Sequence, residues 1–131
     1  MNADAQSSGQ ADSQASNDRK PDLVDPQFVE LAVEVFVMLA EATRVQIILA
    51  LRGGELSVNT LAAAVDKPAP AVSQHLAKLR MARIVATRQE GNKVFYRLEN
   101  AHAAQLVIDA IHQAEHSLGS DHRDHRTLQG G

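Results

Sequence analysis

The chain contains no cysteine. It therefore cannot form a disulfide bond, offer a thiolate to a metal ion, or use a cysteine as a nucleophile or as a redox switch. Any metal site has to be built from His, Asp, Glu or amide side chains. Metal sites built on thiolate ligands are therefore excluded.

Long apolar runs are also missing. No stretch approaches the roughly 20 uninterrupted apolar residues needed to span a bilayer, and the N-terminus lacks the basic and then apolar order of an export signal. We therefore expect a cytoplasmic protein with no membrane partner. With 131 residues, of which 44% are hydrophobic, the chain can bury one modest core, so a single domain with tails is predicted.

An overall positive charge is absent as well, since the formal net charge is −3. The charges are segregated along the chain, however. Residues 1–43 carry two basic and eight acidic side chains, residues 44–97 carry nine and three, and residues 98–131 carry two and five, which gives −6, +6 and −3. A basic centre is typical of a module that binds a polyanion, because Lys and Arg release counterions from phosphates. The alternative is a basic face that is merely solvated.

Composition and periodicity divide the chain into three regions. Residues 1–21 are rich in Ser, Gln, Asn, Asp and Ala and are predicted to be a disordered N-terminal tail. Residues 22–118 are predicted to form one DNA-binding and dimerisation domain. Residues 119–131 are predicted to be a flexible C-terminal tail that contains His.

The domain is expected to be mainly α-helical with a small β-hairpin. Helical spacing and capping signals predict five helices, at about 26–39, 43–51, 57–65, 70–81 and 100–118. β-branched and aromatic residues at 84–89 and 93–98, on either side of a tight polar tip, predict the hairpin. The order α-α-α-α-β-β-α is that of a winged helix-turn-helix. Within the helix at 43–51, Val45, Ile48 and Leu49 are expected to face the core.

The helix at 70–81 is expected to enter the major groove of double-stranded DNA. Val72, Leu76 and Leu79 fall at i, i+4 and i+7 and must face the core, which leaves Ser, Gln and Lys side chains on the other faces. This helix is the second of two short helices joined by a tight break, and a basic hairpin follows it directly. That arrangement places the second helix in the major groove, with the hairpin beside it as a wing. The residues expected to contact DNA are Ser57, Ser73, Gln74, His75, Lys78, Arg88 and Lys93. For His75 the alternative is a half-buried packing role.

Several runs of residues resemble the ArsR/SmtB family of metal-responsive repressors. These runs are Leu39–Arg44, Leu56–Ala62, Lys67–Arg80 and Phe95–Leu98. The likeness covers about residues 28–118, and it is strongest to nickel- and cobalt-sensing members on Lys67–Arg83, Arg97–Asn100 and Ala114–His116. The resemblance implies a homodimer that binds operator DNA without metal and dissociates when metal binds.

Histidine is concentrated near the C-terminus. Five of the six histidines lie in the last thirty positions, namely His102, His112, His116, His122 and His125. His102 and His116 are 116 − 102 = 14 residues apart, about 21 Å along a straight helix, so one helix cannot bring both to one ion. Antiparallel pairing of two copies solves this, because the start of one helix then lies beside the end of the other. The dimer interface is expected at Val107, Ala110, Ile111 and Ala114.

The resemblance implies which residues hold the ion. In the family's C-terminal-helix sites, ligands come from the start of the last helix in one subunit and from its end in the other, and His102 and His116 match such positions. Glu115 and the tail histidines, His122 and His125, are similar to the further ligands of the nickel and cobalt sensors. The role of His112 stays open. Imidazole and carboxylate suit Ni(II) or Co(II), with Zn(II) as an alternative.

The sequence also departs from some of the family's metal patterns. The zinc-sensing pattern has Asp at the position of Asn100 and His at the position of Gln113, which disfavours a four-ligand zinc site of that kind. The family's thiolate sites have no counterpart, since the Leu56–Leu61 block carries Ser57 and Asn59 and no cysteine. Sensing of arsenic, cadmium, lead or copper(I) is therefore disfavoured.

Other functions stay open at this point. The run His112-Gln113-Ala114-Glu115-His116 satisfies the H-x-x-E-H pattern of a class of metalloproteases. Only fifteen residues follow it, too few to build a further protein ligand and a substrate cleft, so no enzyme is expected. The remaining alternatives are a winged-helix regulator without a metal effector and a protein-interaction domain that binds no DNA.

Overall fold

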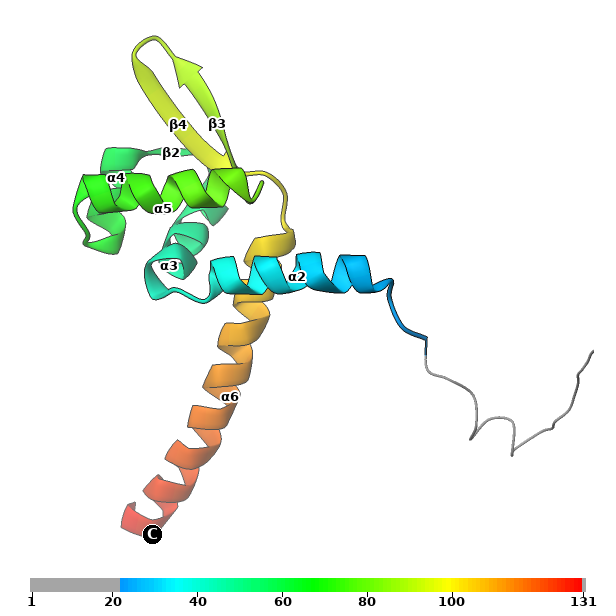
Figure 1. Ribbon diagram of the computed structural model, residues 1–131. Coiled ribbons are helices and arrows are strands. Elements are labelled where there is room, and N and C mark those ends of the chain that lie inside the picture. The colour runs from blue at the N-terminus through cyan, green and yellow to red at the C-terminus, as the bar shows by residue number, and fades with distance from the viewer. Residues whose placement is uncertain (1–21, 131) are drawn as a thin grey trace, which may run out of the picture. The chain divides into compact units, whose positions relative to one another are not determined.

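The computed structural model describes residues 22–130 and the side chains of residues 22–119. Its elements follow in the order α2-α3-η1-β2-α4-α5-β3-β4-α6 (Figure 1). The chain divides into two units, one that ends at Leu31 and one that begins at Ala32. Every residue assigned above to metal, DNA or dimer contacts belongs to the second unit. Among the described helices, none has the length and apolar character that a bilayer crossing requires. The predicted disordered tail falls outside the described residues.

Helix α2 (Pro26–Leu39) is the first of the predicted helices. At its start the Asp25 carboxylate accepts a hydrogen bond of 2.9 Å from the backbone N–H of Gln27. Although most of its residues are apolar, the helix buries none of them within one chain. Phe36 and Val37, for example, are 55% and 65% exposed. Contiguous apolar surface of this kind usually marks a contact with another molecule.

Helix α3 (Ala42–Ala50) leads into the short 3-10 helix η1 (Leu51–Gly53). The Glu41 carboxylate caps α3 by accepting a hydrogen bond of 2.8 Å from the backbone N–H of Arg44. Gly54 ends the segment at φ 137°, a backbone conformation that favours glycine. Gly54 therefore stops this helical segment shortly after residue 51, the predicted end of the helix.

The buried face of α3 differs from the prediction. Ile47 and Ile48 are fully buried, whereas Val45 and Leu49 are only partly buried. The prediction is confirmed for Ile48, and Val45 and Leu49 pack against the core from partly buried positions, whereas the fully buried Ile47 was missed. The run of apolar residues in this helix is nearly continuous, so the helical period does not select one face, and packing against α4, α5 and α6 decides which residues are enclosed.

Helix α4 (Val58–Val65) begins and ends on the signals expected from the sequence. Ser57 is the N-cap, and its Oγ accepts a hydrogen bond of 3.3 Å from the backbone N–H of Thr60. Asp66, at φ 57°, ends α4 in the left-handed region. Pro68 follows, which prevents the helix from continuing.

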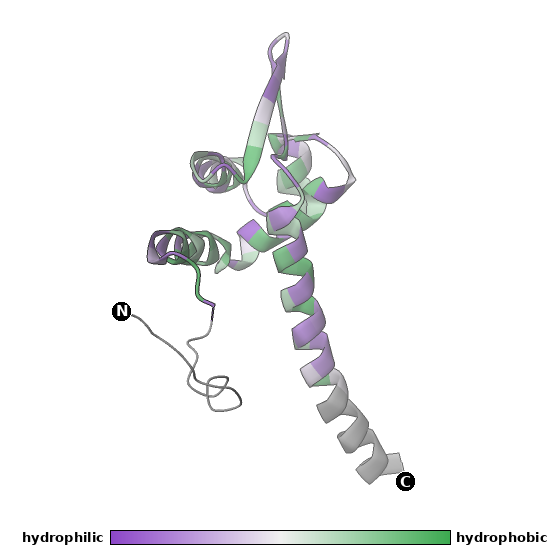
Figure 2. Cartoon of the chain, turned by 90° about the vertical axis from the view of Figure 1, so that its right-hand side faces the viewer, coloured by the Kyte–Doolittle hydropathy of each residue, from purple (hydrophilic) through white to green (hydrophobic). Residues whose placement is uncertain are grey.

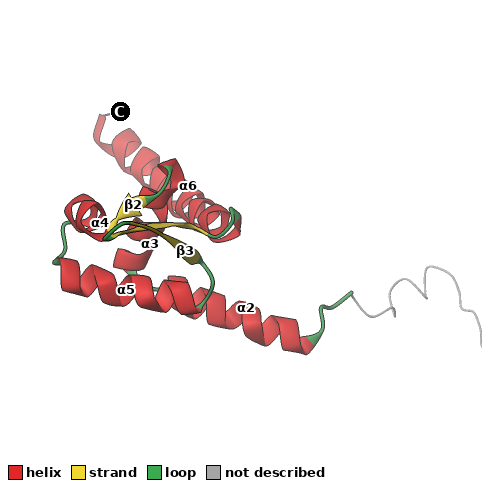
Figure 3. Ribbon diagram, turned by 90° about the horizontal axis from the view of Figure 1, so that it is seen from above, coloured by secondary structure: helices red, strands yellow, loops and turns green. Residues whose placement is uncertain are grey.

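Helix α5 (Ala69–Met81) is joined to α4 by a short loop, and Figure 3 shows the two helices with the strands beside them. Val72, Leu76 and Leu79 are fully buried, which confirms the predicted inward face. They pack in one core with side chains from α3, α4, β3 and α6. The remaining faces of α5 are therefore available for contacts outside the domain.

The predicted hairpin consists of β3 (Val85–Glu90) and β4 (Lys93–Leu98), which pair antiparallel with Glu90 opposite Lys93. Gly91, at φ 61°, forms the turn. Figure 2 shows hydrophilic residues at the tip and hydrophobic ones toward the base. The hairpin is thus fixed at its base by the core and free to contact a polar partner at its tip.

A third strand was not predicted. β2 (Leu56–Ser57) pairs antiparallel with β4, with Leu56 opposite Tyr96 and Ser57 opposite Phe95, so the strand order is β2-β4-β3. A strand of two residues carries no alternation that a sequence can reveal. The fold is otherwise the predicted one, mainly helical with a small antiparallel sheet.

Helix α6 extends from His102 to Gly130. It begins two residues after the predicted start at about 100, whereas the predicted end at about 118 is wrong. Asn100 precedes the helix, and its side-chain oxygen accepts a hydrogen bond of 2.9 Å from the backbone N–H of His102. Gly119 lies within the helix. A glycine inside a helix costs about 1 kcal/mol relative to Ala, which weakens a helix without ending it, and no proline follows. The proposed domain limits, 22–118, stay a prediction.

Candidate nucleic-acid interface and metal centre

A hollow lies next to the hairpin, and Ser73 is the residue of α5 that lines it. Ser73, Gln74 and Lys78 are exposed, as predicted, but Gln74 and Lys78 lie outside the hollow. Residues of three elements surround the hollow, and they include Ser57, Asn59, Thr60, Ser73, Asn92 and Lys93. The first turn of α4, the outer face of α5 and the tip of the hairpin therefore present hydroxyl, amide and ammonium groups toward one space. These are the groups that bind phosphates and base edges.

The sequence prediction did not include Asn59, Thr60 or Asn92, whose exposed polar side chains line this hollow. Asn59 and Thr60 occupy the exposed first turn of α4, and Asn92 lies at the tip of the hairpin. Asn59 and Thr60 could have been predicted from their position in the first turn after Ser57, the residue that caps α4. For Asn92 the signal was its place in the predicted polar tip of the hairpin.

Ser57 serves mainly as a cap. Its hydroxyl accepts the hydrogen bond from the Thr60 N–H and lies 3.1 Å from the Thr60 Oγ1. A hydroxyl oxygen has two lone pairs and one proton, so Ser57 can contact a phosphate only while it also holds the start of α4. Its first role is to fix the geometry of the hollow.

Arg88, predicted to bind phosphate, is paired with acidic side chains. Its guanidinium donates to both carboxylate oxygens of Glu55 and, over 2.9 Å, to Glu90, and it lies 5.0 Å from the centre of the Phe95 ring. The hydrogen bond from Arg88 lowers the pKa of Glu55, and the same bond raises the pKa of Arg88. A phosphate would have to compete with these partners.

His75 is turned away from the exposed side of α5. Its side chain is 22% exposed, and its Nδ1 accepts a hydrogen bond of 3.2 Å from Nε of Arg44. The packing alternative considered from the sequence therefore describes its position in the structure. Arg44 was not predicted as a site residue, because nothing local links α3 to α5.

The predicted ligands that the structure describes lie on α6. His102, His112, Glu115 and His116 are all exposed. Within residues 22–119, no three His, Asp or Glu side chains come together at a position that an ion could occupy. Within one subunit His102 is separated from His116 along α6, as the helix spacing predicted, whereas His112, Glu115 and His116 lie within about one turn of the helix. His122 and His125 lie in the part of α6 whose side chains are outside the described residues.

Chemically, the exposed donors of α6 suit a borderline divalent ion. They are imidazoles and a carboxylate on one helix, and each is exposed and so open to a further contact. His102 also borders a hollow that contains Asn100 and Arg83. This donor set fits Ni(II), Co(II) or Zn(II).

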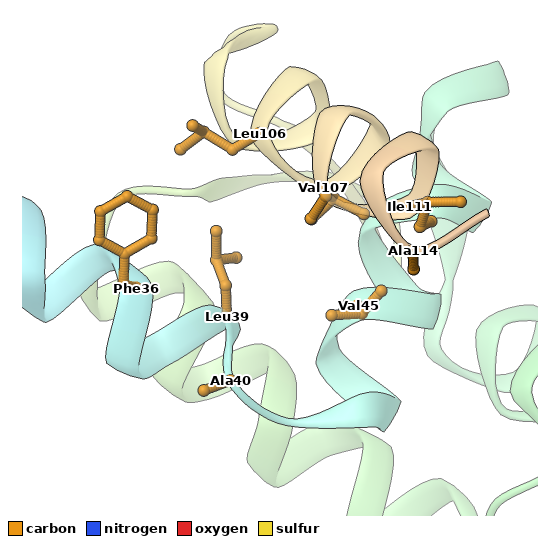
Figure 4. Close-up of a pocket in the computed structure, with 9 residues that line it drawn as sticks. Phe36, Leu39, Ala40, Val45, Leu106, Val107, Ile111 and Ala114 are labelled. Carbon is orange, nitrogen blue, oxygen red and sulfur yellow. The ribbon is translucent and has the colours of Figure 1, made fainter. Parts of the chain in front are cut away.

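An apolar groove lies between α6, the end of α2 and the start of α3 (Figure 4). All four residues predicted for the dimer interface, Val107, Ala110, Ile111 and Ala114, line it. The other lining residues are Phe36, Leu39, Ala40, Val45 and Leu106. In Figure 4 the side chains of α2 and α6 point toward one another across the groove. The volume of the groove is about 360 Å³, and almost all of its surface is apolar.

Comparison with known proteins gives consistent matches. Residues 41–87 match the family described as bacterial regulatory protein, arsR family. The HTH-type transcriptional regulator KmtR of Mycobacterium tuberculosis is 58% identical over 113 residues, which are 86% of this chain and 87% of KmtR. The crystal structure of the AntR antimony-specific transcriptional repressor superposes with a TM-score of 0.69 at 30% identity, over 83% of this chain and 99% of AntR.

A further solved structure is that of a homodimeric winged helix-turn-helix DNA-binding domain from Mycobacterium bovis. It superposes with a TM-score of 0.60 at 26% identity, over 83% of this chain and 92% of that one. The matched family and the relatives are transcriptional regulators, which excludes the metalloprotease alternative for the H-x-x-E-H run. The chain belongs to the ArsR/SmtB family of winged helix-turn-helix transcriptional regulators and is not an enzyme.

Proposed function

We propose that the chain is a cytoplasmic, metal-sensing repressor that binds double-stranded operator DNA as a homodimer and dissociates from it on binding Ni(II) or Co(II). One observation carries the proposal. Helix α6 has exposed imidazoles at His102 and His116, on either side of an apolar groove that the chain itself leaves open. A second copy of α6 fills such a groove and brings the two imidazoles together.

The dimer is supported by the apolar surface that one chain exposes. Helix α2 buries no residue, and Phe36 both lines the groove and is half exposed. A two-fold pairing is self-complementary, since each subunit offers the same face to the other. It also presents two copies of α5, which matches a palindromic operator with two half-sites.

The metal ligands follow from antiparallel pairing of α6. His102 of one subunit lies beside the partner subunit's His116, and Glu115 adds a carboxylate to the same end. His112, His122 and His125 are the further candidates, and more than four ligands favour Ni(II) or Co(II) over Zn(II). When bound, the ion links the two subunits in a geometry with weaker operator affinity. Such a coupling is typically about 1 to 3 kcal/mol and acts equally in both directions.

The DNA contacts divide by chemistry. Gln74 is suited to a base edge and Ser73 to a base or a phosphate, while Lys78 and Lys93 are suited to phosphates. Ser57 reaches the same hollow from the start of α4. Arg88 contributes to the extent that a phosphate displaces Glu55.

We expect the substitution Lys93→Ala to weaken binding to all DNA sequences by a similar factor. A phosphate contact carries no sequence information, so its loss lowers affinity without changing preference. The slope of log K against log salt concentration should become shallower by about 0.9. Fluorescence anisotropy at several salt concentrations measures both. Lys67→Ala is the matched control, since Lys67 is exposed but does not line the hollow, and an equal loss in that variant would contradict the assignment.

The proposed function as a whole is tested by a metal titration. A random duplex library selected with metal-free protein supplies a binding sequence, and the complex is then titrated with Ni(II), Co(II) and Zn(II). We expect release by Ni(II) or Co(II). Release by Zn(II) alone would indicate the zinc-responsive alternative, whereas complexes that persist in all three metals would indicate a regulator without a metal effector.

The absorption spectrum of bound Co(II) gives an independent measure of the site. Six-coordinate Co(II) absorbs weakly in the visible range and four-coordinate Co(II) strongly. We expect the weak spectrum, because the ligands available across the dimer exceed four. The spectrum requires no DNA, so it separates failure of metal binding from failure of the coupling to DNA.

A further inference from the structure

Arg44 connects three elements of the fold. From its place in α3, its Nη1 donates to the backbone carbonyl oxygen of Met38 at 3.0 Å and contacts the Met38 sulfur at 3.2 Å. Its Nε donates to Nδ1 of His75 on α5 at 3.2 Å. The guanidinium thus joins the last turn of α2 to the middle of the helix proposed to read DNA. We call these contacts the Arg44 bridge.

The surroundings of the Arg44 bridge keep it in place. The Glu41 carboxylate accepts from the backbone N–H of Arg44 at 2.8 Å and lies 3.9 Å from Nδ1 of His75. That backbone hydrogen bond lowers the pKa of Glu41, so the carboxylate stays ionised beside the guanidinium. Arg44 and His75 are both partly buried, where hydrogen bonds are shielded from competition by water.

The bridge joins the two surfaces on which the proposed function depends. Met38 precedes Leu39, which lines the apolar groove. His75 follows Gln74, whose side chain is on the exposed face of α5. The planar guanidinium reaches the imidazole through Nε and the carbonyl through Nη1, two nitrogens held at a fixed separation. A Lys ammonium has its three donors on one nitrogen and lacks this fixed fork.

We propose that Arg44 and His75 are positioning residues, which fix the angle of α5 against the end of α2, and that His75 acts through Nδ1 toward Arg44 rather than through a contact with DNA. This inference rests on the proposed DNA binding. Because Nδ1 is the acceptor in this bond, the proton of the neutral imidazole is on Nε2. Only the Nδ1 edge is used in the bridge.

Two substitutions at one position separate the two roles. In His75→Asn, the amide oxygen takes the place of Nδ1 and can still accept from Arg44. In His75→Gln, the amide takes the place of Nε2 and cannot. We expect His75→Asn to keep operator affinity within about twofold and His75→Gln to lose about three- to tenfold, the loss that follows from one hydrogen bond. The salt slope should not change, since no phosphate contact is removed.

Arg44→Lys extends the test to the other partner. We expect it to lower operator affinity at least as much as His75→Gln, since it alters the contact with Met38 as well as the bond to His75. We expect the double variant to lose no more than Arg44→Lys alone, because the bond to His75 is already absent in that variant. If His75→Gln keeps operator affinity and His75→Asn lowers it, His75 contacts DNA through Nε2 and the proposal is wrong. Equal effects of the two His75 variants, or additive losses in the double variant, would also overturn the proposal.

A measurement without DNA keeps this inference separate from the proposed function. The ¹⁵N spectrum of the His75 imidazole should show the proton on Nε2 in the unaltered dimer, and Arg44→Lys should shift the Nδ1 resonance. If the protein binds no DNA but the spectrum is as expected, the proposed function fails while the bridge stands. A protonated Nδ1 in the unaltered protein would show that the bridge is absent. Circular dichroism confirms that each variant is folded.

Discussion

The substitution Ala110→Asp is expected to convert the protein to a monomer and to lower operator affinity by about 100-fold or more. Ala110 is exposed in one chain and lines the apolar groove, so the folded monomer tolerates a carboxylate there at a cost below about 1 kcal/mol in helix propensity. In the dimer the same carboxylate is enclosed without a partner, which costs several kcal/mol. A monomer reaches only one half-site and loses the gain from simultaneous binding.

Sedimentation velocity measures the assembly state and anisotropy measures the affinity. Ala63→Asp is the matched control, since Ala63 is an exposed alanine within α4 and lines none of the described pockets. The control should remain dimeric. If Ala110→Asp also stays dimeric at the concentrations where the unaltered protein is a dimer, the groove is not the interface and the shared metal site loses its basis.

The substitutions His102→Ala and His116→Ala are each expected to abolish metal-induced release while leaving operator affinity nearly unchanged. Loss of a group that merely orients a ligand already weakens metal binding about 10- to 100-fold, so loss of a ligand should exceed about 100-fold. Neither residue lines the hollow beside the hairpin. Co(II) titration measures metal affinity, and His75→Asn serves as a control in which a different histidine is replaced. Release that persists in both α6 variants would refute the site.

Mixing the two defective variants tests whether the site spans the dimer. In a heterodimer, one site combines the two altered positions and the other combines an intact His102 with an intact His116 from the partner. Random exchange makes half of the dimers mixed, so about a quarter of the original sites should reappear. Ligands within one subunit, or helices paired in parallel, predict no recovery. This result would distinguish a shared site from a local one without a structure of the dimer.

The recognition helix shows what the sequence could predict. The three core positions of α5 are separated by polar residues, so only one face of the helix can be buried, and the exposed positions of Ser73, Gln74 and Lys78 follow from the same periodicity. The cap at Ser57 and the turn at Gly91 were likewise predictable, because each is decided within a few residues. These features determine where the DNA-binding groups lie.

Features that depend on distant residues were not predictable in this way. Arg88 pairs with Glu55, and Arg44 pairs with His75. The partners are more than 30 residues apart in the sequence, so no local pattern predicts these contacts. Both contacts change the interpretation of residues that had been assigned to DNA. The end of α6 was missed for a different reason. Gly119 is a local signal that weakens a helix, but the helix continues through it. Local signals describe a tendency that the surrounding chain can override.

The short pairing of β2 with β4 limits how the protein adapts to different DNA sites. Leu56 and Ser57 pair with β4, so the start of α4 is tied to the hairpin through the sheet. We expect this link to keep the spacing between the proposed phosphate contacts of the two segments nearly constant, so that the duplex adjusts its own groove width to meet it. Operators that differ only in untouched base pairs should then bind with different affinities, according to how easily each sequence deforms.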